Sequence, residues 1–170
     1  MRLCKRSCTD VKKGFTVARG TYSGPEDCNC LAVRQAARHI TQFYDQLLAP
    51  SGLRTTQFSI LAKLRRLGPM RINALAAEMV MDRTTVGRNI LPLERDGLVI
   101  VEQGSRDRRS KELRVTEAGE ARFRAGMKGW AQAQRQFEKA FGAKRTTDMR
   151  ILLHAVAATK LGTHAASAEK

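Results

Sequence analysis

The stretch that decides the fold reads NALAAEM (73–79), VMD (80–82) and RTTVGRNILPLERDGLV (83–99), and the loop GSRDRRS (104–110) follows it. This pattern predicts a short helix, a turn, a second helix and then a basic hairpin. The order is typical of a helix-turn-helix, in which the second helix enters the major groove of DNA. A charged hairpin beside it can reach the neighbouring minor groove. The sequence therefore predicts a protein that binds duplex DNA.

The second helix of this stretch has two different faces. Asp82 is a suitable N-cap, and the apolar side chains at positions 86, 90 and 93 fall at helical spacing toward a core. Arginine can pair with guanine, asparagine with adenine, and threonine can touch thymine methyl groups or phosphates. The predicted DNA contacts on the outward face are Arg83, Thr84, Thr85, Arg88 and Asn89. The alternative for this face alone is a solvated helix surface. Pro92 is expected to bend or end the helix beyond these residues.

The hairpin carries three arginines at its tip. Leu98–Glu102 and Lys111–Val115 are rich in β-formers and predict the two strands. The residues expected at the tip are Arg106, Asp107, Arg108 and Arg109. Three guanidinium groups suit a narrow minor groove, where the negative potential is enhanced, and Asp107 is expected to orient one of them. A turn that is merely polar is the alternative.

Helical patterns flank this cassette on both sides. A first helix is predicted over 28–49, and a second begins after Thr55, its expected N-cap. The second helix has its expected apolar stripe at Phe58, Leu61, Leu64 and Leu67. Thr116 is the expected cap of a long helix that Gly142 ends, and a last helix carries Met149, Leu152, Leu153 and Val156. These terminal helices are too apolar for one small domain, so self-association is expected, with internal packing alone as the alternative.

Composition sets broad bounds. The chain has 170 residues, a net charge of +15 and a pI near 10.6, which indicates one domain whose surface attracts polyanions. Residues 1–27 are basic and aperiodic, which predicts a flexible arm or a stretch upstream of the true translation start; 162–170 are read as a tail. No run approaches the roughly 20 apolar residues of a membrane span, and no secretory signal is recognisable. A cytoplasmic protein with cysteine thiols is therefore expected.

The order of elements resembles the MarR family of bacterial winged-helix transcription regulators. The resemblance rests on the 82–99 segment, on Asp107-x-Arg109, and on Leu113-x-Val-Thr-x-Ala-Gly119. It implies a mainly α fold with a β-hairpin wing over 28–161, in which 28–49 and 116–161 form the dimer interface and 55–115 the DNA-binding lobe.

The resemblance also implies a function. A homodimer would place recognition helices 83–96 in the major groove of a pseudo-palindromic operator, with Thr84, Thr85 and Arg88 as contacts. Arg109, braced by Asp107, would enter the minor groove. Most members are repressors, often in stress responses, that release DNA on binding a small aromatic acid or on cysteine oxidation. The chain departs from the family pattern at Val80, Met81, Gly87 and Pro92, which leaves the base preference open.

The sequence defines less well what would trigger release from DNA. Cys28 and Cys30 open the first helix, where the helix dipole favours the reactive thiolate, so they are candidates for a redox sensor with Cys4 or Cys8 as partner. The alternative is that they are small apolar residues. Their spacing does not match a zinc knuckle, so no metal or cofactor is expected. His39, Phe43, Tyr44 and Phe58 are candidates for an effector pocket, and ordinary core packing is the alternative.

The sequence favours one class of function over two others. A ligand- or redox-responsive repressor agrees with all the features above. A non-specific architectural DNA-binding protein would also suit the charge and the basic arm. An enzyme is disfavoured, because the sequence has no nucleophile triad, phosphate loop or suitably placed carboxylate pair.

Overall fold

The computed structural model describes residues 24–104 and 109–161. The chain divides into two units, the first ending at Arg38 and the second beginning at His39. The division falls inside helix α1 (Asn29–Leu48), which the short 3-10 helix η2 (Pro25–Asp27) precedes. Every element after α1 belongs to the second unit.

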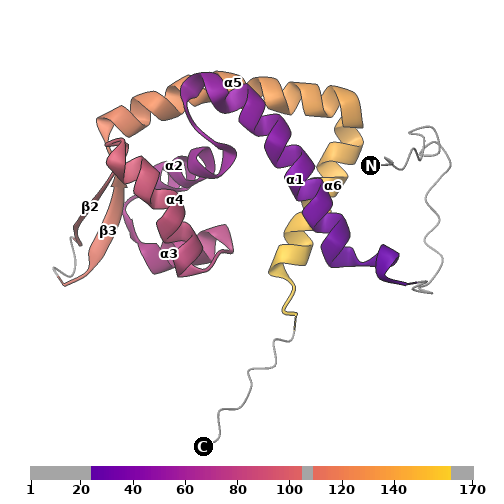
Figure 1. The fold of residues 1–170 in the computed structure, drawn as a ribbon, viewed down its shortest axis with the longest axis horizontal. Coiled ribbons are helices and arrows are strands. Elements are labelled where there is room, and N and C mark those ends of the chain that lie inside the picture. Colours follow the sequence, from indigo (N-terminus) through magenta and orange to yellow (C-terminus); the bar gives the residue numbers. More distant parts are fainter. Residues whose placement is uncertain (1–23, 105–108, 162–170) are drawn as a thin grey trace, which may run out of the picture. The chain divides into compact units, whose positions relative to one another are not determined.

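The second unit contains the predicted winged helix-turn-helix. Its elements after α1 are η3 (Ala49–Ser51), α2 (Thr55–Leu67), β1 (Met70–Arg71), α3 (Ile72–Met79), α4 (Arg83–Arg95), β2 (Val99–Gln103), β3 (Lys111–Val115), α5 (Glu117–Phe141) and α6 (Ala143–Ala158). Figure 1 shows α5 starting beside the β2–β3 hairpin and running past α2, with α6 turning back at its far end. The expected fold class, mainly helical with a hairpin wing, is confirmed.

The sheet has one strand more than the hairpin predicted from the sequence. Its order is β1-β3-β2, and all neighbours are antiparallel. Met70 pairs with Leu113, so β1, which directly precedes α3, is hydrogen-bonded to β3 of the hairpin. Two residues are too few to show a strand period, which is why β1 was not predicted.

The core of the lobe is formed by apolar side chains from α2, α3, α4 and the sheet. Val86, Ile90 and Leu93 are buried on the inner face of α4, as their spacing predicts. In α2, Phe58, Leu61 and Leu64 are buried as expected, but Leu67 is exposed and Ile60 is buried instead. Leu67 is the last residue of its helix, and the chain turns away at Gly68 with a φ of 82°, so its side chain lies beyond the core.

The predicted N-cap is confirmed at the start of α5 and is wrong at the start of α2. Thr116 caps α5 by accepting a hydrogen bond from the Gly119 backbone N–H, at 3.0 Å, as predicted. Thr55, however, is not the N-cap of α2 but its first helical residue. Its backbone N–H donates to Asp45 Oδ1 at 2.6 Å, and its hydroxyl donates to the same atom at 2.7 Å. A carboxylate from α1 therefore satisfies the start of α2, which local sequence does not reveal.

Helix α4 continues for three residues beyond Pro92 and ends at Arg95, so it ends near the proline, as the sequence predicts. Proline removes a single rung of the hydrogen-bond ladder, the one to the carbonyl of residue 88. Ile90 and Leu93 remain buried on either side of it, and this packing holds the last turn in place.

Helix α5 approaches the rest of the unit closely at two glycines. At Gly119 a Cβ would lie 2.1 Å from the Leu98 carbonyl oxygen, and at Gly129 it would lie 2.1 Å from that of Leu47. Only a residue without a side chain permits these contacts. Among the described residues, no helix is both long and apolar enough to cross a lipid bilayer.

Candidate nucleic-acid interface

The turn between α3 and α4 is built without glycine. Val80 adopts the left-handed conformation at a φ of 52°, which a β-branched residue rarely does. Its N–H donates to the Ala77 carbonyl at 3.1 Å, and the N–H of Met81 donates to the Ala76 carbonyl at 2.9 Å. These bonds close the end of α3 in the manner of a helix C-cap, and Met81 packs against the core. The turn thus keeps its geometry where glycine is absent.

Asp82 then starts α4 as predicted. Its Oδ1 accepts the backbone N–H of Thr85 at 2.8 Å, and its Oδ2 accepts the Thr85 hydroxyl at 2.6 Å. These two hydrogen bonds lower the pKa of the Asp82 carboxyl, the side-chain bond having the larger effect. The cap fixes the direction in which the helix leaves the turn.

The outer face of α4 presents a stripe at helical spacing. Thr84 and Arg88 are exposed as expected, and Arg83 is exposed at the first helical position. The same stripe continues with Leu91, which is 63% exposed, and with Arg95. These last two were not among the predicted contacts, although their steps of three and seven from Arg88 would have indicated them.

Thr85 and Asn89 lie at the flank of this stripe. Both are half-buried. The Thr85 hydroxyl is engaged by Asp82, and the Asn89 side-chain amide donates to the Thr85 carbonyl at 2.8 Å. The structure therefore gives these two predicted contacts a local hydrogen-bonding role in the helix and places them less directly outward than Thr84 and Arg88.

The hairpin strands are hydrogen-bonded as far as Gly104 and Ser110. Val101 pairs with Leu113 in the β2–β3 register, and the Gly104 N–H donates to the Ser110 carbonyl at 2.8 Å. On the outer face, Arg114 Nε donates to Glu102 Oε2 at 2.9 Å. This bond lowers the pKa of Glu102 and raises that of Arg114. The two strands are thus paired along their whole length and joined by a further hydrogen bond between Gly104 and Ser110.

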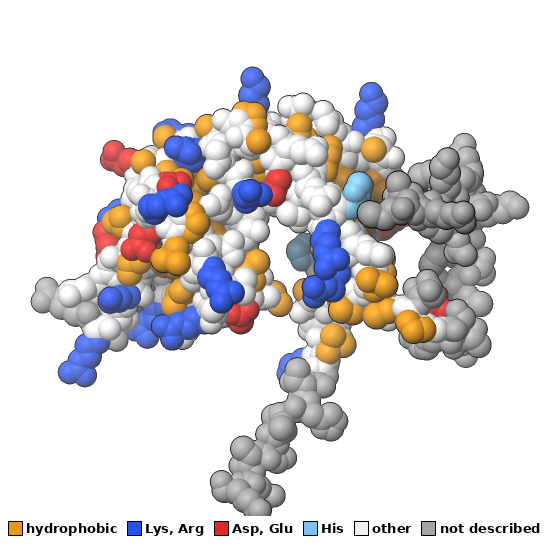
Figure 2. Space-filling view, viewed as in Figure 1, with side chains coloured by type: hydrophobic (Ala, Val, Ile, Leu, Met, Phe, Trp, Pro, Cys, Tyr) orange, Lys and Arg blue, Asp and Glu red, His pale blue; other side chains and the backbone are white. Residues whose placement is uncertain are grey.

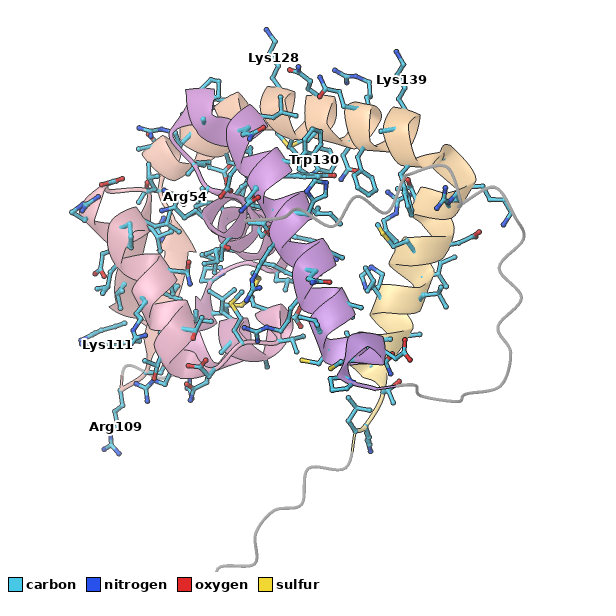
Figure 3. The ribbon with its side chains drawn as sticks, turned by 45° about the vertical axis from the view of Figure 1, so that its right-hand side comes forward. Arg54, Arg109, Lys111, Lys128, Trp130 and Lys139 are labelled. Atoms are coloured by element: carbon cyan, nitrogen blue, oxygen red, sulfur yellow. The ribbon has the colours of Figure 1, made fainter. Side chains whose placement is uncertain are left out.

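Arg109 is the tip residue that the structure describes. It is exposed, and Figure 3 shows it projecting from the hairpin away from the rest of the lobe, with Lys111 nearer the strands. The predicted residues Arg106, Asp107 and Arg108 lie outside the described residues. Figure 2 shows Lys and Arg side chains gathered at the end of the molecule where the hairpin lies.

A pocket of about 420 Å³ lies between α2 and α5. Phe58 forms part of its wall, stacked on Phe123 with ring centroids 4.7 Å apart, and Trp130 lies 6.4 Å from the Phe58 ring. Lys63 and Arg66 also line this pocket, and Lys63 Nζ lies 2.9 Å from Glu78 Oε2. An aromatic wall with cations nearby is chemically suited to an aromatic anion.

The other predicted pocket residues do not line this space. Phe43 and Tyr44 contact each other edge to face, with centroids 5.7 Å apart. Partial burial raises the pKa of the Tyr44 phenol, and the charges of Arg150 and Glu138 act on it in opposite senses. His39, the first residue of the second unit, is also absent from the pocket wall. Phe123 and Trp130 line the pocket but were not predicted to do so, because the sequence assigned the apolar residues of α5 to a dimer interface.

The two described cysteines, Cys28 and Cys30, are exposed free thiols. Within the described part of the chain, no group of three or more histidine, cysteine or acidic side chains is arranged to hold a metal ion. Cys4 and Cys8, the expected disulfide partners, lie outside the described residues.

The fold and the site define a winged helix-turn-helix protein with an exposed reading helix and a hairpin wing. The MarR family model matches residues 53–111. The chain belongs to the MarR family.

Known proteins show the same relationship. The chain is 34% identical over 91 residues to the HTH-type transcriptional regulator YwoH of Bacillus subtilis, a match spanning 54% of this chain and 66% of YwoH. The M. tuberculosis transcriptional regulator MosR, solved in complex with DNA, is 36% identical with a TM-score of 0.67, covering 79% of this chain and 100% of that one. A second MosR structure is 33% identical, also with a TM-score of 0.67, covering 79% and 98%.

Proposed function

We propose that this chain is a sequence-specific transcription repressor that binds a pseudo-palindromic operator as a homodimer. The observation that carries the proposal is the exposed stripe of α4, capped by Asp82 and lying in the same lobe as a hairpin that projects Arg109. A helix of this kind fills the major groove while an arginine tip enters the minor groove. The DNA complex of MosR supports duplex DNA as the partner.

Within the site, roles follow from exposure and chemistry. Arg88 is the residue suited to pair with guanine, and Thr84 to contact a phosphate or a thymine methyl group. Leu91 extends the stripe with an apolar side chain that fits the thymine methyl group and no hydrogen-bonding base edge. Thr85 and Asn89 support these residues through their bonds within the helix.

Dimerisation is proposed from the apolar surface of α6. Ile151, Leu152, Leu153 and Val156 are 61%, 66%, 42% and 55% exposed. They point to several sides of the helix, and a helix that is apolar on most sides is normally buried. A second copy of the chain would cover this surface and would set two reading helices about one turn of DNA apart, roughly 10 base pairs.

Release from DNA is proposed to follow binding of a small aromatic acid in the α2–α5 pocket. The stacked rings of Phe58 and Phe123 and the neighbouring Arg66 support this trigger. Oxidation of Cys28 or Cys30 is the second candidate, favoured by the exposure of both thiols. A variant with Cys28 and Cys30 changed to serine distinguishes the two triggers. Peroxide should release DNA from the wild type but not from this variant, whereas an aromatic acid should release DNA from both proteins.

The test is to sequence the genomic fragments that the purified protein retains, and then to compare a retained fragment with its scrambled version at two salt concentrations. A repressor should prefer the retained fragment at both. A non-specific architectural protein, the alternative suggested by the +15 charge, should bind both duplexes alike and lose about 0.9 log units of affinity per phosphate contact for each tenfold rise in salt. Equal binding to both duplexes would reject the repressor proposal.

A further inference from the structure

Helix α5 carries four cations along one side. Arg124, Lys128, Arg135 and Lys139 are separated by steps of four, seven and four residues, which return to the same side of a helix with 3.6 residues per turn. All four are exposed, and none of them forms an ion pair or hydrogen bond with another described residue. We call these four residues the cationic stripe.

The stripe lies on the side of α5 that faces away from the lobe. Phe123 and Trp130 on the opposite side of the helix pack toward Phe58 of α2. Figure 3 shows Lys128 and Lys139 projecting outward from α5, while Trp130 points inward and Arg109 lies at the far end of the lobe. DNA held by α4 and the hairpin would therefore leave the stripe uncovered.

Among the described residues, no carboxylate forms an ion pair with the stripe, and Glu120, four residues before Arg124, pairs with Arg65 instead. Between positions 121 and 141 the only acid is Glu138, and its carboxylate lies 3.6 Å from Arg150 of α6. The exposed residues interspersed with the cations are three alanines, two glutamines and one methionine: Ala121, Ala125, Met127, Gln132, Gln136 and Ala140. An ordinary solvated helix face mixes both signs of charge, and this one does not.

We propose that the cationic stripe binds the phosphate backbone of a second DNA duplex, so that the protein bridges two duplexes. The stripe spans 15 residue steps, about 22 Å at 1.5 Å per residue, which is about two-thirds of the roughly 34 Å turn of duplex DNA. The glutamines beside the cations can also donate hydrogen bonds to phosphate oxygens. Bridging rests on the proposed function, because α4 and the hairpin hold the first duplex.

Two other occupants are less well matched. A protein partner gains most of its affinity from buried aromatic or other large anchors, and the stripe has none. A membrane surface requires a broad apolar face beside the charges, whereas Met127 is the single large apolar side chain that is exposed on α5. A regular row of phosphates needs only charge and donors, which is what the stripe provides.

The experiment immobilises a genomic duplex that the protein retains and measures capture of a fluorescent duplex of scrambled sequence. The stripe variant combines Arg124→Gln, Lys128→Gln, Arg135→Gln and Lys139→Gln, because glutamine keeps the helix propensity and the donors while removing the charge. The charge-matched control combines Arg2→Gln, Lys5→Gln, Lys12→Gln and Lys13→Gln, outside the described residues. Circular dichroism checks that both variants keep the wild-type helix content.

We expect the stripe variant to capture at least tenfold less of the second duplex while its affinity for the immobilised duplex changes by less than about threefold. The control variant should capture as the wild type does. Undiminished capture by the stripe variant, or an equal loss in both variants, would overturn the proposal. If the wild type binds the first duplex but never captures a second, the bridging proposal is overturned. If the wild type does not bind the first duplex, the proposed function is rejected, and bridging with it.

Discussion

Asp82 links the start of the reading helix to the side chains that this helix presents. By accepting both the N–H and the hydroxyl of Thr85, it turns a predicted base contact into part of the helix cap. The side chain of Thr84 is not held by Asp82 in this way, and Thr84 remains exposed beside it. The cap therefore determines which of two adjacent threonines is available to DNA.

The cap should also make stability depend on pH. Because the folded pKa of Asp82 is below its ordinary value of 3.8, its contribution is complete above that value and is lost as the pH falls through the lowered pKa. Asp82→Asn keeps a good N-cap that does not titrate. In urea titrations, the advantage of wild type over this variant at about pH 6 should shrink at about pH 3. An advantage that is the same at both pH values would contradict the assigned cause.

Arg109 is the exposed tip residue whose removal tests the wing. Arg109→Ala should weaken binding to a retained genomic duplex by about 1–3 kcal/mol in a mobility-shift titration, while the oligomeric state stays unchanged. Arg109→Lys keeps the charge but loses the planar guanidinium, so an intermediate affinity is expected. If the alanine variant binds as tightly as wild type, the hairpin has no part in recognition.

Gly119 is where α5 passes the wing most closely. Gly119→Ala would place a Cβ 2.1 Å from the Leu98 carbonyl oxygen and 2.7 Å from Val115 Cγ1, so the free energy of unfolding should fall by about 3 kcal/mol. Gly87→Ala is the matched control, because the nearest atom there is Ile72 Cδ1 at 3.8 Å, and it should stabilise by about 0.5–1 kcal/mol. Denaturant titration measures both; equal effects would contradict the close approach.

At the scale of elements, local sequence patterns predicted the helix faces, strands and caps that depend on neighbouring residues. The inner face of α4, both strands of the hairpin and the Thr116 cap follow from spacing within a few turns of sequence. The strand at Met70–Arg71 and the capping of α2 by Asp45 could not be predicted, because each depends on a partner at least ten residues away. Local periodicity does not contain that information.

Helix α6 is the element on which dimerisation depends. Leu152→Glu would put a charge into the proposed apolar interface, where it lacks a partner, so sedimentation should show a dissociation constant raised at least tenfold. Binding to a retained duplex should weaken with it, because a monomer reads one half-site only. Thr147→Glu, an exposed position on the same helix, should leave both unchanged. A Leu152→Glu protein that remains dimeric would remove α6 from the interface.

For the whole molecule, the reading face was easier to predict than the pocket. Arg83, Thr84 and Arg88 are exposed as expected because polar residues opposite the apolar stripe of a helix face solvent, and Arg109 is exposed in the hairpin turn. The pocket wall joins α2 to the part of α5 that holds Trp130, more than seventy residues from Phe58. Which aromatic residues meet across such a distance is decided by helix packing, and the sequence shows only that they are apolar.

The chain's only tryptophan lines this pocket and can report on it. Benzoate and hydroxybenzoates should change Trp130 fluorescence in the same concentration range in which they release a bound duplex. Arg66→Gln should raise the concentration needed for both effects several-fold, because it removes a cation from the pocket wall. Lys144→Gln on α6 is the control. Release of DNA without a fluorescence change would place the effector elsewhere.

Pro92 has a consequence for how the reading helix meets its target. Because proline has no N–H, the carbonyl of Arg88 lacks its usual partner four residues on, in the middle of the stripe proposed to touch the bases. The amino-terminal turns of α4 are thus joined to its last turn by one bond fewer than in an uninterrupted helix. We expect those turns to flex slightly as a unit, so that operators of different curvature can be accommodated without disturbing the buried side chains beneath.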